Sequence, residues 1–372
     1  MSAAGPSQGA RPPQGERREA AQGGPPPSAA GPSQGARPPQ GERREAAQGG
    51  QHTRPRAKLV VLVLAIAALC VLAAFAKRSE VYLLTLYLVY LMATLGLNLT
   101  VGYAGQMSLG QAAFLGIGAY IAAIALKAGA PFLLVLPMAA LACFAVGLAL
   151  GFPALRVQHH YLAFATLGFN VLVFLVMRNE EQITGGTFGI SNIPRPHILV
   201  DLSGHLAFFY LTLGAVLLLG IGLWWLLRSP WGRAFAALRD NPIRAESLGV
   251  NITAYTLLAF AIGAACAGVA GVFYASLVEF IEPGPFHFST SLMMLLAVIV
   301  GGSGRFYGPV IGTVIIVLLP ELLRGSTLPW LKFMQTWYLA VFGLAVVVLM
   351  IWLPGGLLSI PDRFRRSPGA VK

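Results

Sequence analysis

The sequence predicts an all-α integral membrane protein with about ten transmembrane helices. Of its 372 residues, 56% are hydrophobic and only 11% are charged, whereas a soluble domain has about 25% charged residues. Apolar runs of the roughly 20 residues that span a bilayer core recur from Leu59 to Leu353. The runs are continuous rather than alternating in polarity, which argues against a spanning β-barrel.

The first 58 residues differ in composition from the rest. The stretch "SAAGPSQGARPPQGERREAAQGG" occupies Ser2 to Gly24 and recurs unchanged at Ser28 to Gly50. It has almost no apolar side chains to bury, so we predict a disordered cytoplasmic tail over 1–58. Its arginines could attract anionic membrane lipid, or the duplication could have no specific role. Residues 59–360 are predicted to form one membrane domain, and 361–372 a second cytoplasmic tail.

Hydropathy divides the membrane domain into ten spans. In chain order they are 59–76, 81–99, 109–127, 131–151, 161–177, 206–227, 254–276, 290–300, 308–323 and 336–353. The eighth and ninth are too short to cross a bilayer alone, so they require neighbouring residues or a broken helix.

The basic residues predict the orientation of these spans. Lys and Arg accumulate in short cytoplasmic loops. With the N-terminus inside, thirteen of the Lys and Arg residues near the spans fall on the inner side and seven on the outer side. Both termini are therefore predicted to be cytoplasmic. The net charge of +12 flanks the spans and forms no basic-aromatic patch, so we expect no nucleic-acid partner.

A polar segment, "SPWGRAFAALRDNPIRAESLGV", separates the sixth and seventh spans within the predicted cytoplasmic loop 228–253. Between Pro230 and Pro242, "WGRAFAALRDN" is expected to form a short helix, and after Pro242 "IRAESLGV" is expected to form a second turn with Gly249 as its C-cap. The segment offers small residues and charges to a partner rather than an apolar face to its own fold. An ordinary charged loop is the alternative interpretation.

Sequence motifs for catalysis are missing. The chain has no G-x-x-x-x-G-K-[ST] phosphate loop, no H-E-x-x-H, no G-x-S-x-G and no paired metal ligands, so we expect this chain neither to hydrolyse ATP alone nor to act as another enzyme or bind a metal. Cys70, Cys143 and Cys266 are predicted to be small buried hydrophobic residues. The spans carry almost no acids or histidines, with Glu321 the main exception. Ion-coupled transport, which needs such groups, is therefore disfavoured.

Two glycine-rich segments interrupt the predicted helices, at Gly96–Tyr120 and at Val298–Ile315. Interrupted helices in the two halves of a transporter indicate a solute route. The alternative is close helix packing through small residues, as at Gly268 and Gly271. The translocation candidates are Asn98, Gly102, Gly105, Gln106, Ser108, Gln111, Thr166, Asn170, Gly301, Gly302 and Gly304.

Six motifs in order carry a family resemblance. They are "NLTVGYAGQMSLGQAAFLGIGAY", "YLAFATLGFN", "ITGGTFGISNIPRP", "SPWGRAFAALRDNPIRAESLGVN", "GVFYASL" and "VIVGGSGRFYGPVIGTVIIVLLPELLR". From about Leu83 to Leu358 the chain resembles the LivM-type permease subunits of bacterial branched-chain amino-acid ABC importers. The resemblance implies an ABC importer permease fold with broken, glycine-rich helices in the bacterial inner membrane. Gln111 stands where many relatives have histidine, and Val171 where many have glutamate, which bears on the solute.

The resemblance also implies partners and a role for the polar segment. Its partners would be a second, LivH-like permease, two ATPase subunits that bind the ATP, an extracytoplasmic solute-binding protein and a branched-chain or related hydrophobic amino acid. No cofactor would bind this chain itself. Residues 229–251 would couple the permease to the ATPase, and the candidates are Gly232, Arg233, Ala237, Arg239, Asp240, Asn241, Ala245 and Gly249. A urea or short-chain amide importer is the near alternative, and an ion-coupled transporter the distant one.

Overall fold

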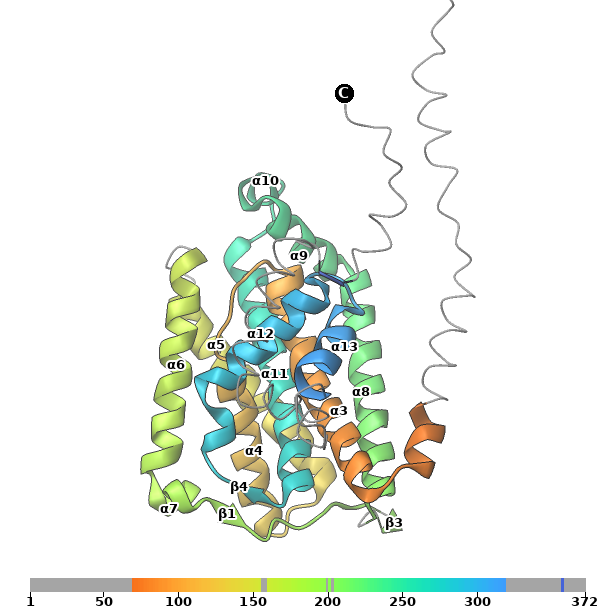
Figure 1. The fold of residues 1–372 in the computed structure, drawn as a ribbon. Coiled ribbons are helices and arrows are strands. Elements are labelled where there is room, and N and C mark those ends of the chain that lie inside the picture. Colours follow the sequence, from red (N-terminus) through yellow and green to blue (C-terminus); the bar gives the residue numbers. More distant parts are fainter. Residues whose placement is uncertain (1–68, 155–158, 199, 202–203, 319–355, 358–372) are drawn as a thin grey trace, which may run out of the picture. The chain divides into compact units, whose positions relative to one another are not determined.

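The computed structural model describes residues 69–154, 159–198, 200–201, 204–318 and 356–357. The two predicted tails, the tenth span, Glu321 and most of the first span lie outside these residues. Figure 1 shows the described helices as an upright bundle.

The described part is almost entirely helical (Figure 1). The main helices are α3 (Arg78–Asn98), α4 (Gln111–Lys127), α5 (Phe132–Ala154), α6 (His159–Asn179), α8 (His205–Arg228), α11 (Ile252–Val278) and α12 (Phe288–Gly302). The short elements are the π-helix η1 (Leu99–Tyr103), α7 (Glu181–Thr184), the 3₁₀ turn η2 (Gly186–Phe188), α9 (Pro230–Asp240), α10 (Pro242–Ser247), the 3₁₀ turn η3 (Gly284–Phe286), α13 (Gly308–Thr313) and the π-helix η4 (Val314–Leu318).

The helix positions agree with the predicted spans from the second to the eighth. Five helical segments are long and apolar enough to cross a membrane, and α4 and α12 are shorter apolar helices. The all-helical membrane fold is thereby confirmed for the described residues, whereas the total of ten spans stays a prediction.

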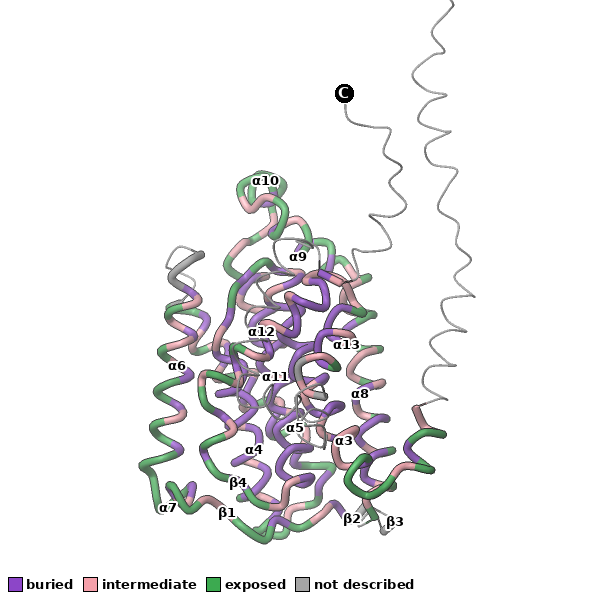
Figure 2. Tube along the Cα trace, in the orientation of Figure 1, coloured by how far each residue is buried: buried purple, intermediate pink, exposed green. Residues whose placement is uncertain are grey.

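Helix α11 lies at the centre of the bundle and packs against α3, α4 and α5. In the most apolar 18-residue stretch of α11, 72% of the sequence is buried, and in that of α3 with η1 the buried share is 78%. The same share is 22% for α5 and for α6. Figure 2 shows this contrast between buried inner helices and the partly exposed α6 and α8. The exposed residues of the outer helices include Leu141, Phe164, Leu218 and Trp225. Such apolar outer faces suit the acyl chains of a bilayer.

Glycines set the spacing of the central helices. A Cβ added to Gly118 of α4 would lie 2.1 Å from the carbonyl oxygen of Gly268 on α11, and one added to Gly271 would lie 2.2 Å from that of Leu115. A Cβ on Gly96 of α3 would lie 2.7 Å from the oxygen of Gly263. Backbones this close tolerate no side chain, so the predicted packing role of Gly268 and Gly271 is confirmed.

The end of the bundle opposite α10 carries short extended segments (Figure 1). Strand β1 (Ile190–Ser191) pairs antiparallel with β4 (Phe280–Ile281), and β2 (His197–Ile198) pairs with β3 (Val200–Asp201). An ion pair between Arg195 and Glu279 joins the connection before α8 to the end of α11. The stretch that matched "ITGGTFGISNIPRP" thus folds into α7, η2 and β1 on this face.

Candidate functional site

Two short helices, α9 and α10, project from the bundle as one segment between α8 and α11 (Figure 1). Pro230 opens α9, and the Ser229 hydroxyl caps it by accepting a hydrogen bond from the Trp231 N–H at 3.2 Å. Asn241 ends α9 and also caps α10, because its Oδ1 accepts from the Arg244 N–H at 3.1 Å. The predicted short helix between the prolines is confirmed, and the predicted second turn after Pro242 is the short helix α10.

Gly249 terminates α10 with a left-handed backbone, φ +84°. Its N–H donates to the Glu246 carbonyl at 2.9 Å, and the Val250 N–H donates to the Ala245 carbonyl at 3.1 Å. This pair of bonds is a Schellman motif, in which Gly249 follows the cap residue Leu248. The expected C-capping role of Gly249 is therefore confirmed.

The projecting segment has an inner and an outer face. Phe235 and Leu238 are buried on the inner face. There the rings of Phe235 and Tyr255 on α11 pack in a T-shaped arrangement, with their centroids 6.2 Å apart. On the outer face Ile243 is 79% exposed and Leu248 is 82% exposed. We call these two side chains the apolar tip. The inner face packs on the bundle, whereas the apolar tip is largely exposed.

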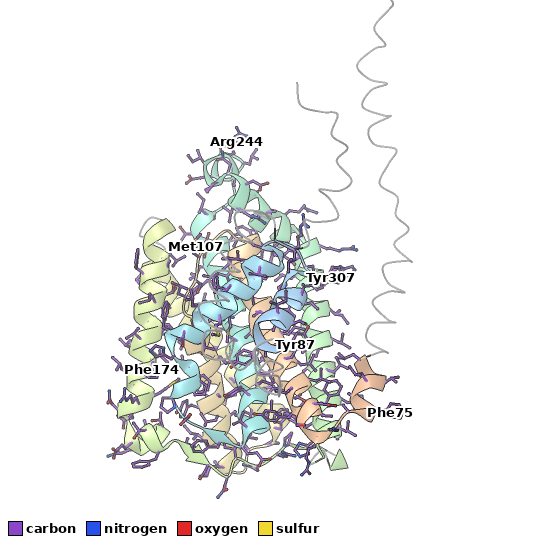
Figure 3. The ribbon with its side chains drawn as sticks, in the orientation of Figure 1. Phe75, Tyr87, Met107, Phe174, Arg244 and Tyr307 are labelled. Atoms are coloured by element: carbon purple, nitrogen blue, oxygen red, sulfur yellow. The ribbon has the colours of Figure 1, made fainter. Side chains whose placement is uncertain are left out.

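The predicted coupling residues divide between these faces. Arg233, Arg239, Asp240 and Gly249 are exposed, Ala237 and Asn241 are partly buried, and Gly232 and Ala245 are buried. Figure 3 places Arg244 at the far end of the projection. Gly232 lies just after the bend between α8 and α9. A side chain does not fit there, since a Cβ would lie 2.1 Å from the Leu227 carbonyl oxygen.

Both glycine-rich segments interrupt their helices, as the sequence predicted. Helix α3 passes into η1, the chain is then non-helical over 104–110, and α4 follows. Helix α12 ends at Gly302, and after the turn 303–307 the chain continues as α13. In Figure 3, Met107 and Tyr307 mark these two breaks, both toward the α10 end of the bundle.

Asn98 connects the two breaks. Its side chain is 3% exposed. The Oδ1 atom accepts a hydrogen bond from the Gly304 N–H at 3.1 Å, and Nδ2 donates to the Arg305 carbonyl at 3.1 Å. A Cβ on Gly102 would lie 2.3 Å from the Gly304 nitrogen, so the two backbones touch. One amide side chain thus ties the end of α3 to the turn after α12.

Arg239 of α9 also contacts both helix breaks. Its Nη1 donates to the Gly102 carbonyl at 2.5 Å. Gly105, with φ +72°, and Gly304, with φ +75°, both lie against the Arg239 side chain. Asn98, Gly102, Gly105, Arg239 and Gly304 form what we call the helix-break junction. It joins one predicted coupling residue to four translocation candidates.

A second polar cluster holds the first turn of α4. The Leu109 N–H donates to Thr166 Oγ1 at 2.9 Å, and the Ala112 N–H donates to Ser291 Oγ at 2.8 Å. Ser291 Oγ in turn donates to Asn170 Oδ1 at 3.3 Å. Thr166 and Asn170 of α6 are wholly buried, and Asn170 Nδ2 has no hydrogen-bond partner within the described ranges.

Gln111, at the start of α4, reaches two other helices. Its Nε2 donates to the Ala93 carbonyl on α3 at 2.8 Å and to the Gly263 carbonyl on α11 at 3.2 Å. Gln106 and Ser108 are buried in the break just before it. Gln106 Oε1 lacks a partner in the part of the chain that the structure describes.

Some candidates lie apart from both clusters, and sequence reasoning missed others. A Cβ on Gly301 would lie 1.9 Å from the Gly308 carbonyl oxygen, so Gly301 packs α12 against α13. Ser291 was not selected, although the polar triplet 289–291 in an apolar run was a signal. The Arg305 carbonyl has no sequence signal at all. Over the described residues no group of three or more His, Cys, Asp or Glu could hold a metal ion.

Five described helical segments are long enough to cross a bilayer, and some helices are interrupted where they carry buried polar groups. These features define this chain as a multi-pass membrane transport protein. It belongs to the family described as the permease component of branched-chain amino acid transport systems, whose model matches residues 79–351.

Its relatives include permeases named for two kinds of solute. The chain is 36% identical over 311 residues to the high-affinity branched-chain amino acid transport system permease protein LivM of Salmonella typhimurium, covering 76% of this chain and 71% of that protein. LivM of Escherichia coli is 36% identical over 324 residues, covering 80% and 74%. The autoinducer 2 import system permease protein LsrC of Escherichia coli is 26% identical over 312 residues, covering 79% and 86%. No solved structure matches the chain.

Proposed function

We propose that this chain is a permease subunit of an ATP-driven importer for branched-chain or related hydrophobic amino acids. The support is its family membership and its 36% identity to two LivM proteins over most of their length. That similarity favours amino acids over urea or short-chain amides. A second, LivH-like permease, two ATPase subunits that bind the ATP and a solute-binding protein complete the complex, and this chain holds no cofactor.

The observation that carries the coupling role is the apolar tip. Ile243 and Leu248 stand exposed beside the charged Arg244 and Glu246 on a projection whose other face is buried. Burial of this face in lipid does not fit, because Arg244 and Glu246, which separate the two apolar residues in the sequence, are exposed as well. Exposed apolar groups rimmed by charges are typical of a protein interface. In this proposal the tip sits in the ATPase subunit.

Aspartate at the tip is expected to release the ATPase. In the purified complex, Ile243→Asp or Leu248→Asp would bury an unpaired carboxylate in the interface, at a cost of about 2–5 kcal/mol. We therefore expect retention of the ATPase on the permease to fall by roughly thirtyfold or more, with uptake falling in parallel. Co-purification and reconstituted uptake measure both.

The matched control is Ile183→Asp, which changes a 62% exposed isoleucine on α7, at the opposite end of the bundle. It should leave the ATPase bound. Equal retention in the tip variants and the wild type would show that the tip is an ordinary surface.

The proposed orientation puts α9, α10 and both chain termini in the cytoplasm of a bacterial cell, with the chain in the inner membrane. In a background without the native cysteines, an impermeant maleimide should label Phe188→Cys on η2 in spheroplasts. It should label Ser247→Cys on α10 only in inside-out vesicles. Both positions are exposed and lie at opposite ends of the bundle. The reverse labelling pattern would overturn the orientation drawn from the basic residues.

A further inference from the structure

We propose that Arg239 is a positioning residue that fastens α9 to both interrupted helices, so that α9, η1 and the turn 303–307 move as one body during transport. The inference rests on the proposed function, because it says how a displacement of the apolar tip reaches the membrane interior. In this inference Arg239 binds a partner inside this chain, whereas the family resemblance implied that it contacts the ATPase.

The chemistry of the Gly102 carbonyl explains why an arginine meets it. Gly102 is the next-to-last residue of η1, which ends at Tyr103. The last carbonyls of a helix have no following amide to bond and carry the negative end of the helix dipole. A guanidinium is a suitable partner, and the hydrogen bond is charge-assisted. Arg239 satisfies this carbonyl from a different helix, 137 positions away in the sequence.

The glycines of the helix-break junction leave room for this one side chain. An ideal Cβ on Gly304 would lie 1.8 Å from Arg239 Nη1 and 2.6 Å from the Gly102 oxygen. One on Gly105 would lie 3.4 Å from both Cα and Cγ of Arg239. A larger residue at Gly304 would displace the guanidinium. Gly304 thus leaves the space that the guanidinium occupies, and Gly102 allows the two breaks to approach each other.

Asn98 links the break after α3 to the break after α12 by hydrogen bonds. Its two hydrogen bonds fix the backbone of Gly304 and Arg305 to the end of α3. The complete path therefore runs from the apolar tip through α10 and Asn241 to Arg239, then to Gly102, and through Asn98 to the turn 303–307. Every step between Arg239 and that turn is a hydrogen bond or a backbone contact.

The first test is Arg239→Gln in the complete, reconstituted complex. Loss of the charge-assisted bond should leave the ATPase bound and still stimulated by the loaded solute-binding protein, while solute uptake per ATP falls about tenfold or more. Arg228→Gln is the matched control, because it removes a charge at the end of α8 where Arg228 covers the Trp224 ring, outside the junction. It should behave like the wild type.

The outcomes of this test separate the two proposals. If Arg239→Gln lost its ATPase as the tip variants do, Arg239 would be a docking residue and the present inference would be wrong. If uptake per ATP were unchanged, the junction would have no part in coupling. If the wild-type complex took up no amino acid in an ATP-dependent manner, the proposed function itself would fail.

A disulfide provides a rescue that a merely structural arginine would not predict. An ideal Cβ on Gly105 lies 3.6 Å from that of Arg239, within the range for a disulfide. In a background without the native cysteines, Arg239→Cys alone should be uncoupled. The pair Gly105→Cys and Arg239→Cys should recover uptake when oxidised and lose it when reduced.

The single variant Gly105→Cys reports any strain from a side chain at this left-handed position. A pair that cross-links without recovering uptake would show that α9 must separate from the break after η1 during transport. A pair that fails to cross-link in the folded complex would contradict the junction geometry. Either result overturns the inference.

Discussion

Gly118→Leu is expected to prevent this chain from forming a stable helical bundle. The new Cβ would lie 2.1 Å from the Gly268 carbonyl oxygen and 2.6 Å from its Cα, and both atoms belong to the backbone of α11. Neither backbone can yield without separating α4 from α11. Since α11 is the central helix, we expect destabilisation of at least about 4 kcal/mol. The measurement is the yield of monodisperse protein in detergent, together with its Tm.

The control for this prediction is Gly214→Leu on α8. Gly214 is exposed, and a Cβ there would meet no atom within 4 Å. Leucine also favours a helix more than glycine does, by about 1 kcal/mol. Gly214→Leu should therefore give normal yield and an unchanged or higher Tm. If Gly118→Leu matched it, the close approach of α4 and α11 would be wrong.

Gln111→Glu is expected to be nearly as damaging. The wild-type amide donates to the Ala93 and Gly263 carbonyls from a site that is 2% exposed. A carboxylate would lose both bonds and direct its charge at two carbonyl oxygens. An unpaired buried charge costs about 3–5 kcal/mol. Yield and Tm should fall sharply, and uptake should be lost with them.

Two further substitutions separate charge from hydrogen bonding at this position. Gln111→Met keeps the length and removes the donors, and should cost about 1 kcal/mol, because each carbonyl lies inside a helix that supplies its own amide donor. Gln111→His keeps one ring N–H donor and should be milder than glutamate. Equal damage from glutamate and methionine would mean that the charge is irrelevant.

Much of the fold could be predicted from local features of the sequence. The span positions follow from hydropathy, and the two projecting helices follow from Pro230 and Pro242 with their capping residues. The left-handed backbone at Gly249 follows from its place after the second helix. Each of these features depends on a few neighbouring residues, so an isolated sequence specifies it. The tails, the tenth span and the total number of spans lie outside the described residues and stay predictions.

The contacts inside the candidate site could not be predicted in the same way. The sequence selected Asn98, Gly102, Gly304 and Arg239 separately, and only the structure brings them together. Two of the groups they bind are backbone atoms more than a hundred positions away, and every residue offers such atoms alike. Ser291 was missed for a related reason, since its partner Asn170 lies on another helix, 121 positions away.

The neutral interior of the bundle has an electrical consequence. Among the residues whose burial the structure describes, no lysine, arginine, histidine, aspartate or glutamate is buried. Moving one elementary charge through the membrane potential is worth about 2.3 kcal/mol per 100 mV, but these helices carry no such charge in their core. An amino-acid zwitterion adds none. Rearrangement of these helices therefore moves no buried charge through the membrane field, and the cell's voltage neither drives nor opposes that part of the cycle.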